Sequence, residues 1–181
     1  MNVATHLIPP SSALDQTYRE FIAEVEHHGE RLTPWVLAME APTFEELIRK
    51  LEQYSQGIGL QSGFVPHSTY WLVDDDSNLL GVSNLRHELT PSLKLIGGHI
   101  GFGVRPSQRG KGLGCRLLSL TLREAKRRGM DRLVLTCDRQ NQASARVIEK
   151  NGGVLDCEVS LDDGNVTRRY WIDLDHCDQR A

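Results

Sequence analysis

The stretch Arg109-Gly110-Lys111-Gly112-Leu113-Gly114 separates a short apolar segment from a segment with helical periodicity. Upstream of it, Ile100–Val104 predicts a strand that Arg105-Pro106 ends. Downstream of it, apolar residues recur at the spacing of one helix face: Leu113, Leu117, Leu118, Leu122 and Ala125. A glycine-rich junction between a strand and a helix directs unpaired backbone N–H groups and the positive end of the helix dipole to one point. The stretch therefore predicts a binding site for a phosphate or pyrophosphate.

Glycine-rich turns also serve other purposes, and the spacing discriminates among them. A nucleotide-binding P-loop requires Ser or Thr after its Gly-Lys pair, but Gly112 follows Lys111. A dinucleotide-binding loop requires Gly or Ala where this chain has Cys115. Both nucleotide-binding motifs are therefore disfavoured, whereas a structural turn without a ligand stays an alternative.

The stretch resembles the coenzyme A loop of the GNAT acetyltransferase superfamily, whose motif is R/Q-x-x-G-x-G/A, and it matches every position of that motif. The lead-in Val104–Gln108 and the later segment Asn141–Gly153 are similar to the segments that flank the loop in the family. Gly97–Ser107 and the ending Arg169-Tyr170-Trp171-Ile172 resemble a subgroup of predicted acetyltransferases. The resemblance is strongest over residues 97–157.

This resemblance implies an α/β (α+β) fold of the GNAT type, with one domain spanning residues 1–181 and an acetyl-CoA-binding core at about 97–157. The fold has a mixed central sheet of about seven strands, with helices on both faces. The expected order of elements is β-α-α-β-β-β-α-β-α-β-β. The resemblance also implies acetyl-CoA as cosubstrate and no metal.

The patterns along the chain predict the elements of that order. Strands are expected at 5–8, 69–73, 79–88, 100–104, 132–137, 154–160 and 166–173. Helices are expected from Ser11 or Ser12 to about His28, from a Thr43/Glu46 capping box to Gly57, after Gly112, and over 144–150. Residues 29–42 and 90–96 are expected to connect these elements without regular structure.

Composition limits the class of protein. The chain has 181 residues, of which 39% are hydrophobic and 25% charged, and its net charge is −3, which disfavours general nucleic-acid binding. Its four cysteines, Cys115, Cys137, Cys157 and Cys177, form no C-x-x-C pair, so reduced thiols in a cytoplasmic protein are expected. No signal peptide or membrane span is expected. A monomer or a homodimer is expected, because edge strands near Tyr170 would allow pairing.

The resemblance assigns the cofactor-binding residues. Backbone amides of the loop would hold the pyrophosphate, and Arg109 and Lys111 would add positive charge. The loop residues concerned are Arg109, Gly110, Lys111, Gly112, Leu113 and Gly114. The main chain of Phe102, Gly103 and Val104 would pair with the amide-bearing pantetheine arm as an added strand does. Asn141 and Ser144 would bind that arm or fix the separation of the strands, and Asn141 as a helix cap is an alternative.

The chemistry requires an amine to lose a proton. An alkyl amine with a pKa of about 10.4 is mostly protonated at pH 7, and freeing its lone pair costs about 4–5 kcal/mol. His99 and Glu88 are therefore candidate bases, with His87 beside Glu88, and Tyr170 is a candidate acid. Each of these residues has a structural alternative, in the packed core or on a solvated strand end.

One departure from the family bears on catalysis. Many GNAT enzymes have a tyrosine seven residues after the motif asparagine, which protonates the leaving thiolate, but Ile148 occupies that position here. The sequence predicts an N-acetyltransferase acting on a primary amine by direct transfer in a ternary complex. A catalytically idle acyl-CoA-binding or sensory protein is an alternative. A GNAT toxin that acetylates aminoacyl-tRNA is disfavoured by the net charge of −3.

Overall fold

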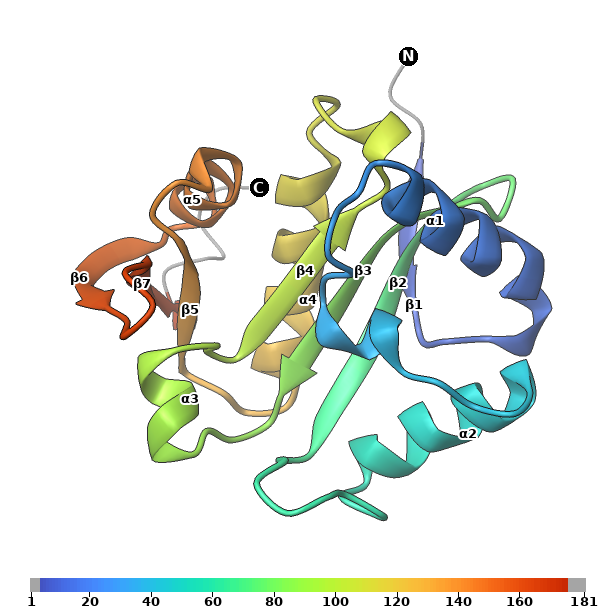
Figure 1. Cartoon of the computed structure of the whole chain (residues 1–181), viewed down its shortest axis with the longest axis horizontal. Coiled ribbons are helices and arrows are strands. Elements are labelled where there is room, and N and C mark those ends of the chain that lie inside the picture. Colours follow the sequence, from blue (N-terminus) through green and yellow to red (C-terminus); the bar gives the residue numbers. More distant parts are fainter. Residues whose placement is uncertain (1–3, 176–181) are drawn as a thin grey trace.

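A computed structural model describes residues 4–175 of the chain, and their strands form two antiparallel sheets (Figure 1). The first sheet has the order β1-β2-β3-β4, with β1 at Thr5–Ile8, β2 at His67–Asp74, β3 at Leu79–Arg86 and β4 at Ile100–Val104. The second has the order β5-β7-β6, with β5 at Arg132–Asp138, β6 at Val154–Ser160 and β7 at Val166–Asp173. The positions of the strands agree with those expected from the sequence.

The helices are α1 (Asp15–His27), α2 (Phe44–Ser55), α3 (Pro91–Leu95), α4 (Leu113–Arg127) and α5 (Gln142–Lys150), with 3₁₀ turns at Ser12–Leu14, Trp35–Ala38 and Pro106–Gln108. The predicted cap of α2 is present, since Thr43 Oγ1 accepts a hydrogen bond from the Glu46 N–H at 3.2 Å. The segment expected to be irregular, 90–96, contains the short α3. Thr90 caps this helix and Pro91 fixes its first residue.

Helices cover both faces of the first sheet, as Figure 1 shows, with α1 and α2 in front and α4 behind. Alternate residues of β3 therefore enter two different cores. Val82 packs with the aromatic residues of α1 and α2, whereas the Ser83 hydroxyl lies 2.7 Å from that of Thr121 on α4. The second sheet packs against α5 and the far end of α4 through Leu135, Ile148 and Tyr170 among others.

The two sheets meet at a single point between β4 and β5. The His99 N–H donates to the Val134 carbonyl at 2.7 Å, and the Val134 N–H donates to His99 Nδ1 at 2.9 Å. At Gly98 a Cβ would lie 2.5 Å from the Val134 oxygen, so only glycine allows this approach. Beyond this point the two strands run in the same direction and separate (Figure 1). The predicted single mixed sheet is thus divided into two sheets at this position.

Candidate active site

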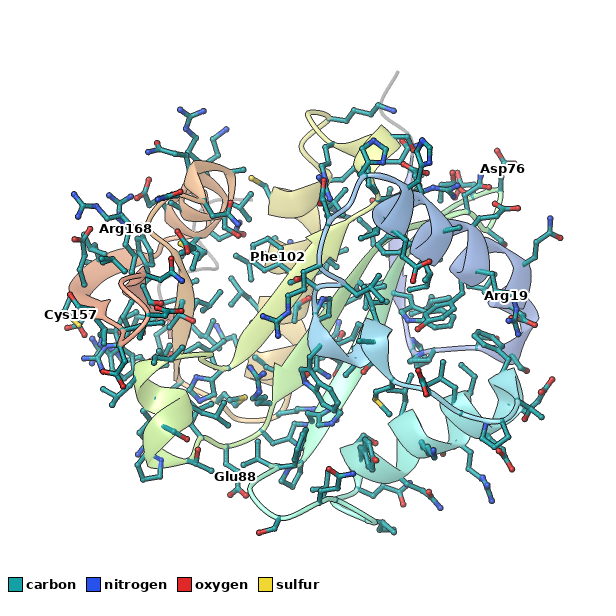
Figure 2. The ribbon with its side chains drawn as sticks, viewed as in Figure 1. Arg19, Asp76, Glu88, Phe102, Cys157 and Arg168 are labelled. Atoms are coloured by element: carbon teal, nitrogen blue, oxygen red, sulfur yellow. The ribbon has the colours of Figure 1, made fainter. Side chains whose placement is uncertain are left out.

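The separation of β4 from β5 leaves strand edges without a strand partner. The Arg86 N–H donates to the His99 carbonyl and the Arg105 N–H to the Leu80 carbonyl, so every second residue between them pairs with β3. Phe102 is one of the intervening residues, and its backbone N–H and C=O face away from β3. On β5, the same alternation turns the backbone of Thr136 away from β7. Phe102 lies between the two sheets in Figure 2. A chain with amide groups can pair with such edges.

The glycine-rich loop lies at the carboxyl end of β4. Gly110 and Gly112 have φ values of 76° and 80°, and a Cβ at either position would meet open space. These glycines are therefore needed for their left-handed backbone and not for lack of room. The first intrahelical bond of α4 runs from the Arg116 N–H to the Gly112 carbonyl at 3.1 Å, which leaves the preceding N–H groups of the helix terminus for an anion.

Gly114 has a packing role as well as a place in this helix terminus. A Cβ there would lie 3.2 Å from Val147 Cγ2 of α5. Its absence allows α4 to approach α5 closely, while the Leu113 and Gly114 backbone stays in the first turn of the helix. The loop thus combines close helix packing with a candidate anion site.

The two cations of the loop are already engaged. Arg109 forms a bidentate ion pair with Glu30, at 2.6 and 2.7 Å, and its Nε donates to the Val104 carbonyl at 3.1 Å. Hydrogen bonding from Arg109 lowers the pKa of Glu30. Lys111 Nζ donates to the side-chain oxygen of Gln108 at 2.8 Å. The positive charge that the sequence assigned to Arg109 is therefore offset by a carboxylate that the motif does not contain.

Asn141 caps α5. Its Oδ1 accepts a hydrogen bond from the Ser144 N–H at 3.0 Å, and it follows the carboxyl end of β5. The cap uses the amide oxygen and leaves Nδ2 for another partner. The cap and the predicted contact with a bound chain are therefore compatible.

The contacts of His99 favour a structural role over that of a base. Burial lowers the pKa of His99 to about 4, so the ring is neutral at pH 7. Its Nδ1 accepts the Val134 N–H, and the remaining nitrogen, Nε2, then carries the proton. No lone pair is left to accept a proton from a substrate.

The other two predicted catalytic residues are Tyr170 and Glu88. The Tyr170 ring is fully buried beneath α5 beside Ile148, its hydroxyl donates to Glu149 at 3.3 Å, and burial raises its pKa. These features favour packing over acid catalysis. Glu88 is exposed just beyond β3, at the lower margin of the molecule in Figure 2.

A cavity of about 310 Å³ lies beside the junction of β3 and β4, and none of its residues was predicted from the sequence. It is lined by Trp35, Phe64, Val65, His67, Arg86 and Leu93. Arg86 Nη1 donates to the carbonyls of Gly97 and Gly98, at 3.3 and 2.8 Å, next to the point where β4 meets β5. One feature of the sequence points to this cavity. The polar residue His67 begins β2 and lies on the same face of that strand as the apolar Trp71.

The loop that contributes Trp35 lies directly on β4. A Cβ at Gly103 would be 2.1 Å from the Thr33 carbonyl oxygen, and one at Gly101 would be 3.2 Å from Pro34 Cβ. The loop thus covers the face of β4 opposite α4 and forms one wall of the cavity.

A more polar hollow of about 440 Å³ lies between the β5–α5 turn and the β6–β7 turn. Its two arginines, Arg139 and Arg168, both pair with Glu158, at 3.6 and 3.0 Å. Their charges are therefore largely satisfied within the protein.

Within residues 4–175 the side chains form no group of three or more potential metal ligands. The thiols of Cys115, Cys137 and Cys157 are free, and burial raises the pKa of Cys137 to about 11; Cys177 lies outside the described residues. Among the described helices, none has the length and apolar character required to cross a membrane.

Comparisons with known proteins agree with this arrangement. A family model described as acetyltransferase (GNAT) domain matches residues 5–154. Solved structures with the same fold include the ribosomal L7/L12 α-N-protein acetyltransferase RimL in complex with coenzyme A, at 17% identity and a TM-score of 0.68 over 97% of this chain and 96% of that one. A ribosomal-protein-S5-alanine acetyltransferase from Vibrio fischeri has 16% identity and a TM-score of 0.67, covering 96% and 94% of the two chains.

A third similar structure is a single-residue variant of the spermidine N-acetyltransferase SpeG from Vibrio cholerae, with 16% identity, a TM-score of 0.65 and 97% of each chain covered. A search of the curated proteins gave no match.

Proposed function

Because the chain belongs to the GNAT acetyltransferase family, we propose that it transfers the acetyl group of acetyl-CoA to a primary amine by direct attack in a ternary complex. One observation carries this proposal: the glycine-rich loop, the free edge of β4 and the cavity lie in sequence along one strand.

The geometry supports a specific orientation of the donor. Its pyrophosphate is held by N–H groups of Gly110–Gly114 at the carboxyl end of β4, and its amide-bearing arm pairs with Phe102 and Val104. Gly103, which was also expected to pair with the arm, directs its backbone toward β3. The five residues of β4 span about 17 Å at the usual rise of a strand. An arm extended along them therefore delivers the thioester to the amino end of β4, beside the cavity.

The reaction needs little help from the protein at the leaving group. The amine nitrogen bonds to the thioester carbonyl carbon, the C–S bond breaks, and the nitrogen loses a proton. A thiol with a pKa of about 8.5, as for cysteine, leaves readily as the thiolate near neutrality. The contacts of His99 and Tyr170 do not favour proton transfer, so Glu88 stays the candidate base, acting through water. The apolar walls of the cavity favour the neutral form of the amine.

The similar structures support an amine as acceptor. They are an α-N-protein acetyltransferase of ribosomal L7/L12, a ribosomal-protein-S5-alanine acetyltransferase and a spermidine N-acetyltransferase. These acceptors share a primary amine and differ in everything else, so the family alone leaves the rest of the acceptor open.

The test is a thiol-release assay with acetyl-CoA and a panel of amines. The loop variant Gly112→Trp is compared with Gly129→Trp, because both glycines have φ near 80° (80° and 77°) and open space around the Cβ position. Both variants bear a similar backbone strain of about 1–2 kcal/mol. We expect Gly112→Trp alone to lose acetyl-CoA binding and turnover by about a hundredfold. An equal loss in both variants, or no binding by the wild type, would overturn the proposal.

A catalytically idle acyl-CoA-binding protein is the second candidate. The observation that favours it is the buried Ile148 at the position of the family's tyrosine, together with the engaged ring of His99. Calorimetric binding of acetyl-CoA without thiol release on any amine would select it over the transferase.

A further inference from the structure

The cavity beside β4 combines apolar walls with nitrogen donors. Trp35, Phe64, Val65 and Leu93 provide the apolar surface, and His67 and Arg86 are the polar lining residues. None of these six residues is an Asp or Glu. A volume of about 310 Å³ is at the lower end of the range of small-molecule sites, about 300–1,000 Å³.

Arg86 carries a charge that no described residue balances. Within residues 4–175 no carboxylate forms an ion pair with it, and its Nη1 donates only to the neutral carbonyls of Gly97 and Gly98. Burial lowers the pKa of Arg86, as expected for a guanidinium with reduced access to water. Its Nε and Nη2 stay available to a ligand. A cation withdrawn from water is stabilised by an anion that forms paired hydrogen bonds with it.

His67 provides a second donor beside Arg86. Its side chain is 1% exposed, and its Nδ1 accepts a hydrogen bond from Asn84 Nδ2 at 2.8 Å. Burial lowers the pKa of His67 to about 4, so the ring is neutral at pH 7 and its proton lies on Nε2. That nitrogen has no hydrogen-bond partner in the described part of the chain, and an unpaired buried donor is costly. The rings of Trp35 and Tyr54 hold the imidazole edge-on, at centroid distances of 5.2 and 5.4 Å.

We propose that the acceptor is a free amino acid with an apolar or aromatic side chain, whose carboxylate binds Arg86 and His67 and whose side chain lies against Trp35, Phe64 and Leu93. This inference rests on the proposed transferase function and names the substrate class of its acceptor site. A polyamine fits poorly, because several positive charges would face Arg86 without a carboxylate on the lining residues to balance them.

The experiment compares three acceptors that share a ring and an amine: phenylalanine, phenylalaninamide and phenethylamine. Only the first has a carboxylate. We expect acetyl transfer to phenylalanine with a kcat/KM about 10- to 100-fold above that for the other two, since hydrogen bonds to a charged group are strong. The same comparison with leucine and tryptophan and their amides covers other apolar side chains. Efficient transfer to phenethylamine or spermidine with none to the amino acids would overturn the inference and leave the proposed function intact.

The variant Arg86→Gln separates carboxylate binding from structural support. We expect it to reduce the preference for phenylalanine over its amide to near unity. Arg132→Gln is the control, because Arg132 lies over the Trp171 ring at 4.2 Å in the second sheet, away from the lining residues. An equal loss for acid and amide would assign Arg86 a structural role and overturn the inference. If the glutamine variant does not fold, Arg86→Lys, which keeps the charge, is tested in its place.

Calorimetry tests the inference without turnover. We expect phenylalanine to bind the CoA-loaded wild type and to bind the Arg86 variant about tenfold or more weakly. This result would support the carboxylate site even if no acetyl transfer occurs. The absence of acetyl transfer would then count against the proposed function and not against this inference. Absence of binding by any amino acid of the panel would overturn the inference.

Discussion

Glu30 and Arg109 are far apart in the sequence and form the ion pair beside the anion-binding loop. Side-chain exposures of 39% and 46% make this a surface pair, which contributes about 0–1 kcal/mol to stability. The pair affects phosphate binding more than it affects stability, because Glu30 repels an incoming phosphate and neutralises the charge of Arg109. A carboxylate at this position therefore weakens the predicted coenzyme A site.

We expect Glu30→Gln to raise the affinity for coenzyme A about two- to fivefold at low salt, and the gain to shrink as salt screens the loop. Isothermal calorimetry at two salt concentrations measures this effect. Glu46→Gln, which removes a carboxylate paired with Arg49 on α2, is the matched control. A lower affinity in Glu30→Gln would contradict the account and mean that Glu30 positions Arg109 for the phosphate.

Burial lowers the pKa values of three histidines, His67, His87 and His99, from 6.5 to about 4. Between these values the unfolded chain binds protons that the folded chain does not. The stabilisation is therefore complete above pH 6.5 and is lost as the pH falls toward about 4. Each histidine adds a slope of up to about 1.4 kcal/mol per pH unit.

We expect the free energy of unfolding, measured by urea titration, to be lower at about pH 5 than at about pH 7. His99→Asn retains an acceptor for the Val134 N–H and removes one titrating group, so it should reduce the fall by about a third. A free energy that is constant between these two pH values would show that the three rings are not buried as described.

At the scale of elements, the loop before α2 depends on the bare backbone of β4. At Gly103 a Cβ would lie 2.1 Å from the Thr33 carbonyl oxygen, a backbone atom that moves only with its loop. At Gly101 the nearest atom is Pro34 Cβ at 3.2 Å, which requires a shift of a few tenths of an ångström. The two glycines lie on the same face of the same strand and differ in this contact.

We expect Gly103→Ala to reduce the free energy of unfolding by about 3 kcal/mol and Gly101→Ala by about 1 kcal/mol, following the range for overpacking. Urea unfolding of both variants measures the difference. Equal effects would indicate that the Thr33 carbonyl does not lie against β4.

Local patterns were sufficient to predict most elements. The capping box at Thr43 and Glu46 and the strand pattern at 166–173 depend on neighbours in the sequence, and α2 and β7 lie where they were expected. Two features escaped prediction, for different reasons. The short α3 forms at a Thr90-Pro91 signal that resembles a loop, and the division of the sheet depends on His99 meeting Val134.

At the scale of the whole molecule, the binding of an anion by the glycine-rich loop stays a prediction, whereas the position of this loop could be predicted because it is one continuous stretch. The cavity could not, since Trp35, Phe64, Arg86 and Leu93 come from four separate segments that only the fold brings together. The residues that bind Arg109 and Tyr170 could not be predicted either, because they are distant in the sequence: Glu30 is 79 residues from Arg109, and Glu149 is 21 residues from Tyr170. The sequence therefore indicated candidate residues more readily than the ion pairs and hydrogen bonds that their side chains form.

In the proposed complex, coenzyme A lies along β4 with its pyrophosphate on the loop at 109–114. Amide chemical shifts of the ¹⁵N-labelled protein, followed during a titration with acetyl-CoA, test it directly. We expect the largest changes at Gly110–Gly114 and at Phe102 and Val104, with smaller ones at the cavity near Arg86. Changes confined to the hollow around Arg139 and Arg168, with the loop amides unmoved, would contradict it.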